Sequence, residues 1–233
     1  MSSGTGGHIL RDYDEELEHL RTTLLEMGGL AERQLGDGLR ALVERDARLG
    51  DAVCTADYRV NDLEVRIDEE ATAIIARRQP AGPDLRLLTA VIRSSTDLER
   101  IGDEAEKLGR FAIEFAGAQS LEPGMLGGLE RLGDIVRAVL HEALDAFARG
   151  DAEAAARIAA DDGRVNAACD AAMRELVTYM MEDPRTMQRS LHALWCARAL
   201  ERIGDHARNL CEAVVYVVEG RDIRHEGTQA PPE

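Results

Sequence analysis

One short segment occurs twice in this chain of 233 residues. The hexapeptide Leu-Glu-Arg-Ile-Gly-Asp occupies positions 98–103 and recurs unchanged at positions 200–205. The repeat extends upstream with a slip of a few residues, since the tripeptide Arg-Val-Asn at 59–61 corresponds to the one at 164–166. The period is close to half the chain and is therefore far longer than that of a solenoid repeat. We expect two similar units packed together, each with one copy of the acidic motif.

The residues around each motif follow a helical pattern. Between 87 and 115, apolar residues recur at alternating steps of four and three, the spacing of a helix that packs in a bundle. Residues 193–217 repeat this pattern around the second motif. A composition with 45% hydrophobic residues, 3% aromatic residues and six prolines also favours helices over sandwiches and barrels. The first seam comprises Leu87, Val91, Ser94, Leu98, Ile101, Ala105, Leu108, Ala112 and Phe115.

Turn-forming residues divide the chain into six helical segments, three in each half. The expected fold class is all-α, with two tandem, duplicated three-helix antiparallel bundles built from six long helices. The breaks are expected near Gly50-Asp51, Pro80 to Pro83, Pro123-Gly124, Gly150-Asp151 and Asp183-Pro184. The expected domains are a flexible N-terminus at 1–8, a first three-helix repeat at 9–120, a second three-helix repeat at 121–220 and a flexible C-terminal tail at 221–233.

The charge of the chain limits its partners. A formal net charge of −16 would repel nucleic acid and an anionic membrane surface, and few aromatic side chains are present to stack on bases. The four cysteines show no CxxC spacing, which suits reduced thiols better than a disulfide framework or a zinc finger. No stretch reaches the roughly 20 apolar residues of a membrane span, and residues 1–7 do not resemble a signal peptide. We expect a cytoplasmic protein that does not bind nucleic acid.

The acidic residues of the motif are expected on the surface of their helix. If Leu98 and Ile101 face the core, Glu99 and Asp103 lie on the opposite side, one turn apart. Glu106 extends the acidic stripe by another turn. Such outward carboxylates differ from the inward-facing ligands of ferritin-like bundles. The same geometry places Glu201 and Asp205 outside the second bundle.

A second polar stripe supplies further oxygen ligands. Asp57, Asn61, Glu64 and Asp68 are spaced along one face of the preceding helix, which antiparallel packing could bring beside the first motif. Oxygen atoms from two helices indicate a site for a hard metal ion. The alternative is a solvated face whose charges are relieved by nearby arginines. In the second half Asp162 and Asn166 are kept, but Cys169 and Met173 replace Glu64 and Asp68, so the two sites need not be equal.

Other candidates are weaker. Gly102 and Gly204 indicate close approach of a backbone or an ion, or else a close helix crossing. His206, next to Asp205, is expected to be solvated. His192 and Cys196 have a spacing that permits metal binding, but Cys196 falls on the apolar seam, which favours a structural role. Glu16 and His19 form the only Glu-x-x-His in the chain, whereas a ferritin-like dimetal site needs two.

Several segments together resemble the PhoU family of phosphate-signalling and phosphate-transport accessory proteins. The resemblance covers nearly the whole chain and begins with the Glu-Arg-Ile-Gly-Asp motifs at 99–103 and 201–205. It continues in the segments 74–80, 84–87, 145–149, 179–186 and 221–225.

The resemblance implies a protein of two three-helix bundles that binds metal through Glu99, Asp103, Glu201 and Asp205. It also implies a non-enzymatic adaptor that restrains the sensor histidine kinase of the phosphate two-component system when phosphate is plentiful. The same adaptor would curb the phosphate ABC transporter by contacting its ATPase subunit, and would reach the membrane only through these partners. The oxygen-rich ligands favour magnesium, manganese or iron over structural zinc.

Two alternatives remain from the residues themselves. The chain could be a purely structural helical scaffold or interaction module with surface charge, or, less favoured, a dimetal-carboxylate enzyme. No phosphate-binding loop after a strand, no Ser/His/Asp arrangement and no nucleophile elbow is present in the sequence. Long amphipathic helices often leave an apolar strip uncovered, so a homodimer is also expected.

Overall fold

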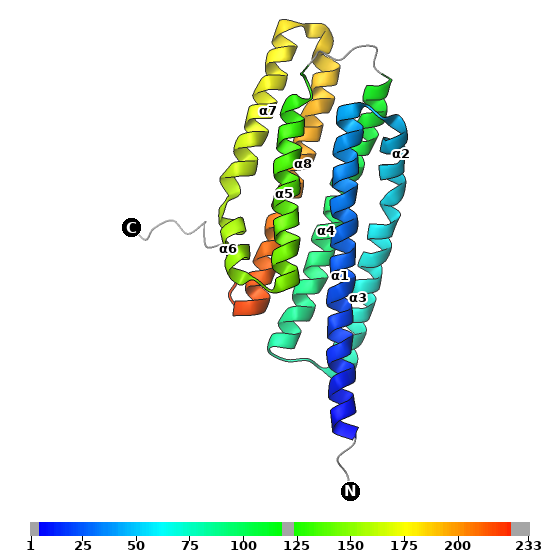
Figure 1. Cartoon of the computed structure of the whole chain (residues 1–233), viewed down its shortest axis with the longest axis vertical. Helices are drawn as coiled ribbons and strands as arrows, with labels where there is room; N and C mark the ends of the chain where they lie inside the picture. Colours follow the sequence, from blue (N-terminus) through cyan, green and yellow to red (C-terminus); the bar gives the residue numbers. More distant parts are fainter. Residues whose placement is uncertain (1–4, 118–123, 225–233) are drawn as a thin grey trace, which may run out of the picture.

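The fold is built from helices arranged in two repeats (Figure 1). The computed structural model describes residues 5–117 and 124–224. In the first repeat α1 spans Thr5–Glu44, α2 Ala47–Ala56, α3 Tyr58–Arg78 and α4 Pro83–Ala116. In the second repeat α5 spans Gly127–Arg149, α6 Ala152–Ala160, α7 Asp162–Glu182, a 3-10 turn Pro184–Thr186, and α8 Met187–Glu219. The prediction of an all-α protein with two tandem three-helix bundles is confirmed, with the middle helix of each bundle divided into two pieces.

The middle helix of each repeat is interrupted at an acidic residue, at positions one residue apart in the repeat register. Asp57 separates α2 from α3, and Asp161 separates α6 from α7. The first expected break, at Gly50-Asp51, is wrong, because Gly50 lies inside α2. The turn instead precedes α2 at Asp46, whose carboxylate accepts hydrogen bonds from the amides of Arg48 and Leu49. The break expected at Gly150-Asp151 is present, and Asp151 caps α6 in the same way.

The ends of the chain differ in part from the expected boundaries. Helix α1 begins at Thr5, so residues 5–8, which were expected in a flexible N-terminus, are helical. Residues 1–4 lie outside the described residues, as do the expected repeat boundary at 120/121 and positions 225–233 of the tail.

Four helices form the centre of the molecule, and the divided helices flank them. Helices α1 and α5 pack together, as do α4 and α8, which run in opposite directions (Figure 1). The α2/α3 pair covers one side and the α6/α7 pair covers the other. The predicted seams face inward, since Leu98, Ile101, Leu200 and Ile203 are fully buried. Burial of each such side chain contributes about 1.5 to 3 kcal/mol to stability.

The contact between α4 and α8 is held by polar pairs, one of them around the buried Glu104, as well as by apolar residues. Glu104 is 6% exposed, and its Oε1 accepts hydrogen bonds from Arg202 at 3.0 Å and Lys107 at 2.8 Å. Nearby, His206 Nδ1 lies 2.8 Å from Oδ1 of Asp97. The prediction that His206 is solvated is wrong, because its side chain is 16% exposed and lies in this contact. Buried charges need such partners, so these pairs set the register between the repeats.

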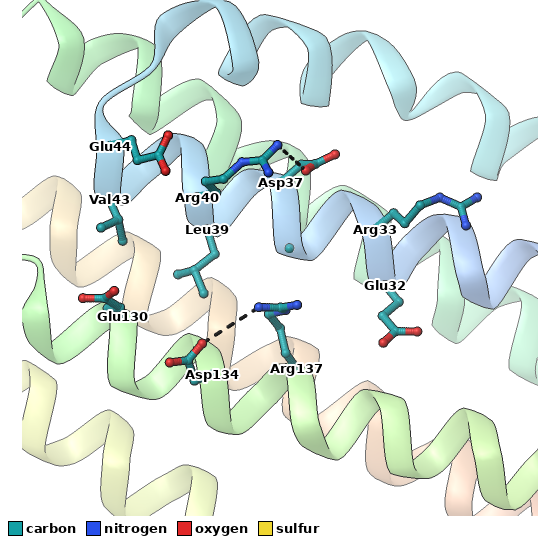
Figure 2. A pocket seen from close by; sticks show the side chains of 11 residues that line it. Glu32, Arg33, Asp37, Leu39, Arg40, Val43, Glu44, Glu130, Asp134 and Arg137 are labelled. Atoms are coloured by element: carbon teal, nitrogen blue, oxygen red, sulfur yellow. Dashed lines mark hydrogen bonds and ion pairs between the residues drawn. The ribbon is translucent and has the colours of Figure 1, made fainter.

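The contact between α1 and α5 interlocks reciprocally. A Cβ atom added to Gly133 of α5 would overlap the side chain of Leu39, and one added to Gly28 of α1 would overlap that of Leu144. Figure 2 shows Leu39 extending from α1 toward α5. Beside this contact lies a cleft of about 610 Å³ whose walls carry ion pairs within each helix, including that of Arg137 with Asp134.

Helices α2 and α4 cross at two glycines. A Cβ atom on Gly50 would lie 2.6 Å from the carbonyl oxygen of Gly109, and one on Gly109 would lie 2.8 Å from that of Gly50. The two backbones are therefore in contact at this point. A backbone atom cannot move aside as the end of a flexible side chain can. This crossing holds the end of α2, and with it Asp57, against α4.

We expect Gly109→Ala to lower the free energy of unfolding by about 1 to 3 kcal/mol, because the added methyl group overlaps the α2 backbone. The matched control is Gly29→Ala, where the nearest atom to the added methyl group would be Arg33 Nη1 at 3.7 Å. There the higher helix propensity of alanine should raise stability by up to about 1 kcal/mol. Denaturant unfolding followed by circular dichroism measures both variants, and equal effects would contradict the backbone contact.

Candidate metal centre

Asp57 is a buried carboxylate at the junction of α2 and α3. Its side chain is fixed from two sides, because Gln34 Nε2 donates to Oδ1 at 3.0 Å and Asn61 Nδ2 donates to Oδ2 at 3.1 Å. Gln34 also reaches the carbonyl oxygen of Gly102 in α4 at 3.3 Å. Asp57 is only 8% exposed, and no arginine or lysine is paired with it among the described residues. The fold thus holds an unpaired carboxylate against the motif helix.

The glycine of the motif makes room for this carboxylate. A Cβ atom on Gly102 would lie 3.0 Å from Oδ1 of Asp57. At the corresponding place in the second repeat, a Cβ atom on Gly204 would lie 2.9 Å from Cγ1 of Val165. Both glycines therefore permit close helix packing, but only the first one admits a charged group.

Three carboxylates meet at this point. One oxygen from each of Asp57, Asp103 and Glu106 lies within 4.8 Å of the other two. Asp57 comes from the α2/α3 junction, and the other two residues are one turn apart on α4. Glu106 also accepts a hydrogen bond from Arg110 at 2.7 Å. The sequence pattern placed Glu106 on the acidic stripe but did not identify it as a ligand, although its position three residues after Asp103 put it on the same face.

The local electrostatics disfavour ionisation in this cluster. Burial raises the pKa of Glu99, and the negative charges of Asp103, Glu64 and Asp57 raise it further. Burial raises the pKa of Asp103 as well, followed by the charge of Asp57. Neither carboxylate has an ion-pair partner in the described part of the chain. A bound cation would remove this repulsion.

A further oxygen at the cluster lacks a partner. Oδ1 of Asn61 is buried and accepts no hydrogen bond from any described residue, while the amide nitrogen of the same side chain binds Asp57. Leaving a buried acceptor unsatisfied costs about 1 to 3 kcal/mol. An amide oxygen beside carboxylates belongs to the donor set that hard cations prefer. The residues therefore fit a metal ion of this class.

The corresponding acids of the second repeat are neutralised by the chain itself. Glu201 pairs with Arg198, and Asp205 lies 3.4 Å from Arg208. These arginines stand where the first repeat has Thr96 and Glu106. In the solvated-face alternative Arg202 would neutralise Asp205, but it binds Glu104 of the first repeat instead.

The remaining ligands expected in the second site are fewer. Asn166 is half-buried, and the side chain of Asp162 lies outside the described residues. Cys169 is buried, and burial followed by the charge of Glu201 raises the pKa of its thiol to about 11, so it stays protonated. Asp103 and Asp57 belong to the only group of three metal-binding side chains found among the described residues.

The weaker sequence candidates have structural partners. Glu16 binds Arg78 at 3.0 Å, and His19 lies 3.7 Å from Glu70. Cys196 is fully buried in the core, which agrees with a structural role. Asp68 is exposed on α3.

Comparison with known proteins gives a consistent result. The PhoU domain profile matches twice, at residues 24–112 and 129–214. The chain belongs to the PhoU family. It is 48% identical over 220 residues to a PhoU homolog of Pseudomonas putida, covering 94% of this chain and 86% of that one. It is 45% identical to PhoU of Escherichia coli, covering 94% and 90% of the two chains.

Solved PhoU structures share the fold. The crystal structure of PhoU from Pseudomonas aeruginosa superposes with a TM-score of 0.86 at 47% identity, covering 90% of this chain and all of that one. PhoU from Streptococcus pneumoniae, a phosphate transport system regulatory protein, gives 0.82 at 26% identity, covering 91% and 99%. The curated relatives from Pseudomonas putida and Escherichia coli are phosphate-specific transport system accessory proteins. Among the described residues of this PhoU-family chain, no helix is both long and apolar enough to cross a membrane.

We expect Asp103→Asn to stabilise the metal-free protein near neutral pH. A carboxyl group whose pKa is raised by folding binds its proton more tightly in the folded state than in the unfolded state. The folded protein therefore becomes less stable as pH rises above the ordinary pKa of the group, roughly 4. The amide removes this loss. The gain in melting temperature should therefore be present at about pH 7 and should shrink toward about pH 4.

Asp205→Asn is the matched control, because Asp205 is the corresponding residue and has Arg208 as a partner. It should give no gain at either pH. A similar gain in both variants would mean that the first cluster carries no special repulsion.

Proposed function

We propose that this protein is a metal-binding, non-enzymatic regulator of phosphate homeostasis. Its membership of the PhoU family and the names of its relatives, which are phosphate-specific transport system accessory proteins, support an accessory role in phosphate transport. In this role the protein restrains the sensor histidine kinase of the phosphate two-component system when phosphate is plentiful. It also restrains the phosphate ABC transporter through its ATPase subunit. Both contacts take place in the cytoplasm.

The observation that carries the metal-binding part is the first carboxylate cluster. Asp57, Asp103 and Glu106 bring oxygens within 4.8 Å of one another, and burial, followed by the charges of neighbouring carboxylates, raises the pKa values of Glu99 and Asp103. We assign Glu99, Asp103, Asp57 and Asn61 to this centre, with Glu106 as an added ligand.

The donor set indicates which ions the centre would hold. Carboxylate and amide oxygens without histidine or thiolate favour magnesium, manganese or iron, and make zinc less suitable. The ion would neutralise the acidic face and could present open coordination positions to a partner.

A second centre at Glu201, Asp205, Asp162 and Asn166 is a weaker part of the proposal. The charges of Arg198 and Arg208 already offset those of Glu201 and Asp205. A cation would therefore have to compete with two guanidinium groups, and we expect it to bind less tightly there than at the first cluster.

The alternatives differ in their requirements. A dimetal-carboxylate enzyme needs two inward-facing Glu-x-x-His pairs, whereas the one pair in this sequence, Glu16 and His19, is engaged by Arg78 and Glu70. A purely structural scaffold requires no ion, so metal content distinguishes it from the proposal. The two repeats, taken as 9–120 and 121–220, serve as the functional units, and the protein acts as a homodimer.

Elemental analysis by inductively coupled plasma mass spectrometry tests the metal centre. Protein purified without chelators should contain bound metal, and the double variant Glu99→Gln/Asp103→Asn should lose it because two ligands are gone. The matched variant Glu201→Gln/Asp205→Asn should keep most of it. Circular dichroism of equal helicity shows that both variants are folded.

Metal-free wild-type protein, even after addition of manganese, iron or magnesium, would contradict the metal-binding part. Equal loss of metal in both double variants would contradict the ranking of the two centres and leave metal binding itself intact.

A pull-down with the cytosolic part of the sensor histidine kinase tests the adaptor role. Glu99→Ala/Asp103→Ala should reduce the captured kinase if the metal-bearing face forms the contact. Glu201→Ala/Asp205→Ala is the corresponding control. Unchanged capture by the first variant would place the interface elsewhere on the protein.

A further inference from the structure

The duplication creates two equivalent grooves along the contact between α4 and α8. One groove, here the tryptophan groove, is lined by Lys107, Arg110, Phe111, Trp195, Arg198 and Arg202. The other, here the tail groove, lies at the opposite end of the same contact and includes Asp222 and Arg224 after α8. The tail-groove residues that correspond to the six above are, in the same order, Asn209, Glu212, Ala213, Arg93, Thr96 and Arg100. The two grooves share a backbone frame and differ in chemistry.

The lining of the tryptophan groove is rich in basic side chains in a strongly acidic protein. Its lining carries four cations, whereas only Glu104 and Glu114 contribute carboxylates. Three of these cations, Lys107, Arg110 and Arg198, correspond to Asn209, Glu212 and Thr96 in the tail groove. This concentration of basic side chains contrasts with the net charge of −16 of the whole chain. It would attract an anionic ligand.

Arg110 pairs with Glu106 and Arg198 pairs with Glu201, but the four basic side chains of the groove remain 43–65% exposed, and exposed ion pairs of this kind contribute little free energy, so a phosphate group can compete for them. Glu104 is shared between Lys107 at 2.8 Å and Arg202 at 3.0 Å, so one carboxylate faces two positive charges. Guanidinium and ammonium groups arranged in this way bind phosphate oxygens well. The position of Glu104 in the repeat contact also keeps Arg202 fixed in place, which reduces the entropy cost of binding.

The groove also offers an exposed aromatic surface. Trp195 is the only tryptophan in the chain, and its side chain is 64% exposed at the edge of the groove. Phe111 lies in the lining and packs against His192, with ring centroids 5.5 Å apart. Large aromatic side chains gain from being buried, so one left open in a groove offers a surface for another flat ring. Such surfaces stack on nucleic acid bases.

We propose that the tryptophan groove binds a mononucleotide, with the base stacked on Trp195 and the phosphates bound by Arg198, Arg202 and Lys107. The groove encloses about 480 Å³, which lies within the usual range of roughly 300 to 1,000 Å³ for small-ligand sites. A nucleic acid polymer is a poorer fit, because the surrounding acidic surface would repel its successive phosphates. The groove shares no lining residue with the first carboxylate cluster, but its Arg110 pairs with Glu106 and its Arg198 with Glu201, so nucleotide binding has to be tested in the absence of metal.

Fluorescence tests the proposal directly, because Trp195 is the only indole in the protein and lies in the site. Purified wild-type protein is titrated with AMP, ADP and ATP in the absence of divalent ions, so that no nucleotide can bind through a metal. Saturable quenching is the expected result. Tripolyphosphate and adenosine, which each supply half of the ligand chemistry, should bind more weakly than the nucleotides.

Variants separate the two parts of the site. Trp195→Ala, measured by calorimetry, should weaken nucleotide binding by roughly fivefold or more through loss of stacking. Arg198→Gln should weaken it while retaining the fluorescence signal. The matched control is Arg131→Gln, a charge loss at an exposed ion pair with Glu175 on α5 and α7, outside the groove. It should leave affinity unchanged.

Three results would overturn the proposal. The first is the absence of quenching and of binding heat with every nucleotide at millimolar concentration. The second is equal weakening by Arg131→Gln and Arg198→Gln, which would indicate only general electrostatic attraction. The third is binding of an acidic peptide in place of nucleotides, which would assign the groove to a partner protein.

Discussion

The antiparallel contact between α4 and α8 is the constraint on which the rest of the structure depends, because these two helices carry both acidic motifs and join the repeats. Glu104 and Arg202 form an ion pair across it, and His206 contacts Asp97 across it. Each of these side chains is held by a partner from the other repeat. Helix α4 thereby faces α2/α3 on one side of the molecule, and α8 faces α6/α7 on the other. On the α2/α3 side, Asp57 reaches the first motif.

Duplication gave the protein two repeats with the same helix arrangement, and substitutions then gave their surfaces different charges. In the first repeat Glu106 adds a carboxylate to the cluster, whereas Arg208 at the corresponding position removes one charge from the second. Cys169 replaces Glu64 with a thiol that stays protonated. The same divergence separates the tryptophan groove from the tail groove. Small changes on a shared scaffold thus produced surfaces that differ in charge.

Periodicity in the sequence predicted which helix faces are buried, because apolar spacing reports directly on the seam. It also placed Glu99, Asp103 and Asp57 on faces that could meet. It did not predict the partners of Glu104 and His206, since a helical pattern shows which side faces inward but not which residue of another helix lies opposite. The interruption at Asp57 was missed for a related reason. A one-residue break leaves the apolar spacing of the flanking turns almost unchanged, so its only signal is the acidic residue itself.

The reciprocal fit of leucines and glycines between α1 and α5 has a consequence for the history of the chain. Each repeat supplies both a protruding residue and a recess, with Leu39 and Gly28 in the first and Leu144 and Gly133 in the second. A surface that contains both halves of a contact is complementary to a copy of itself, which is the defining property of a twofold symmetric dimer. The monomer therefore preserves, in one covalent chain, the symmetry expected of an ancestral pair of identical three-helix subunits.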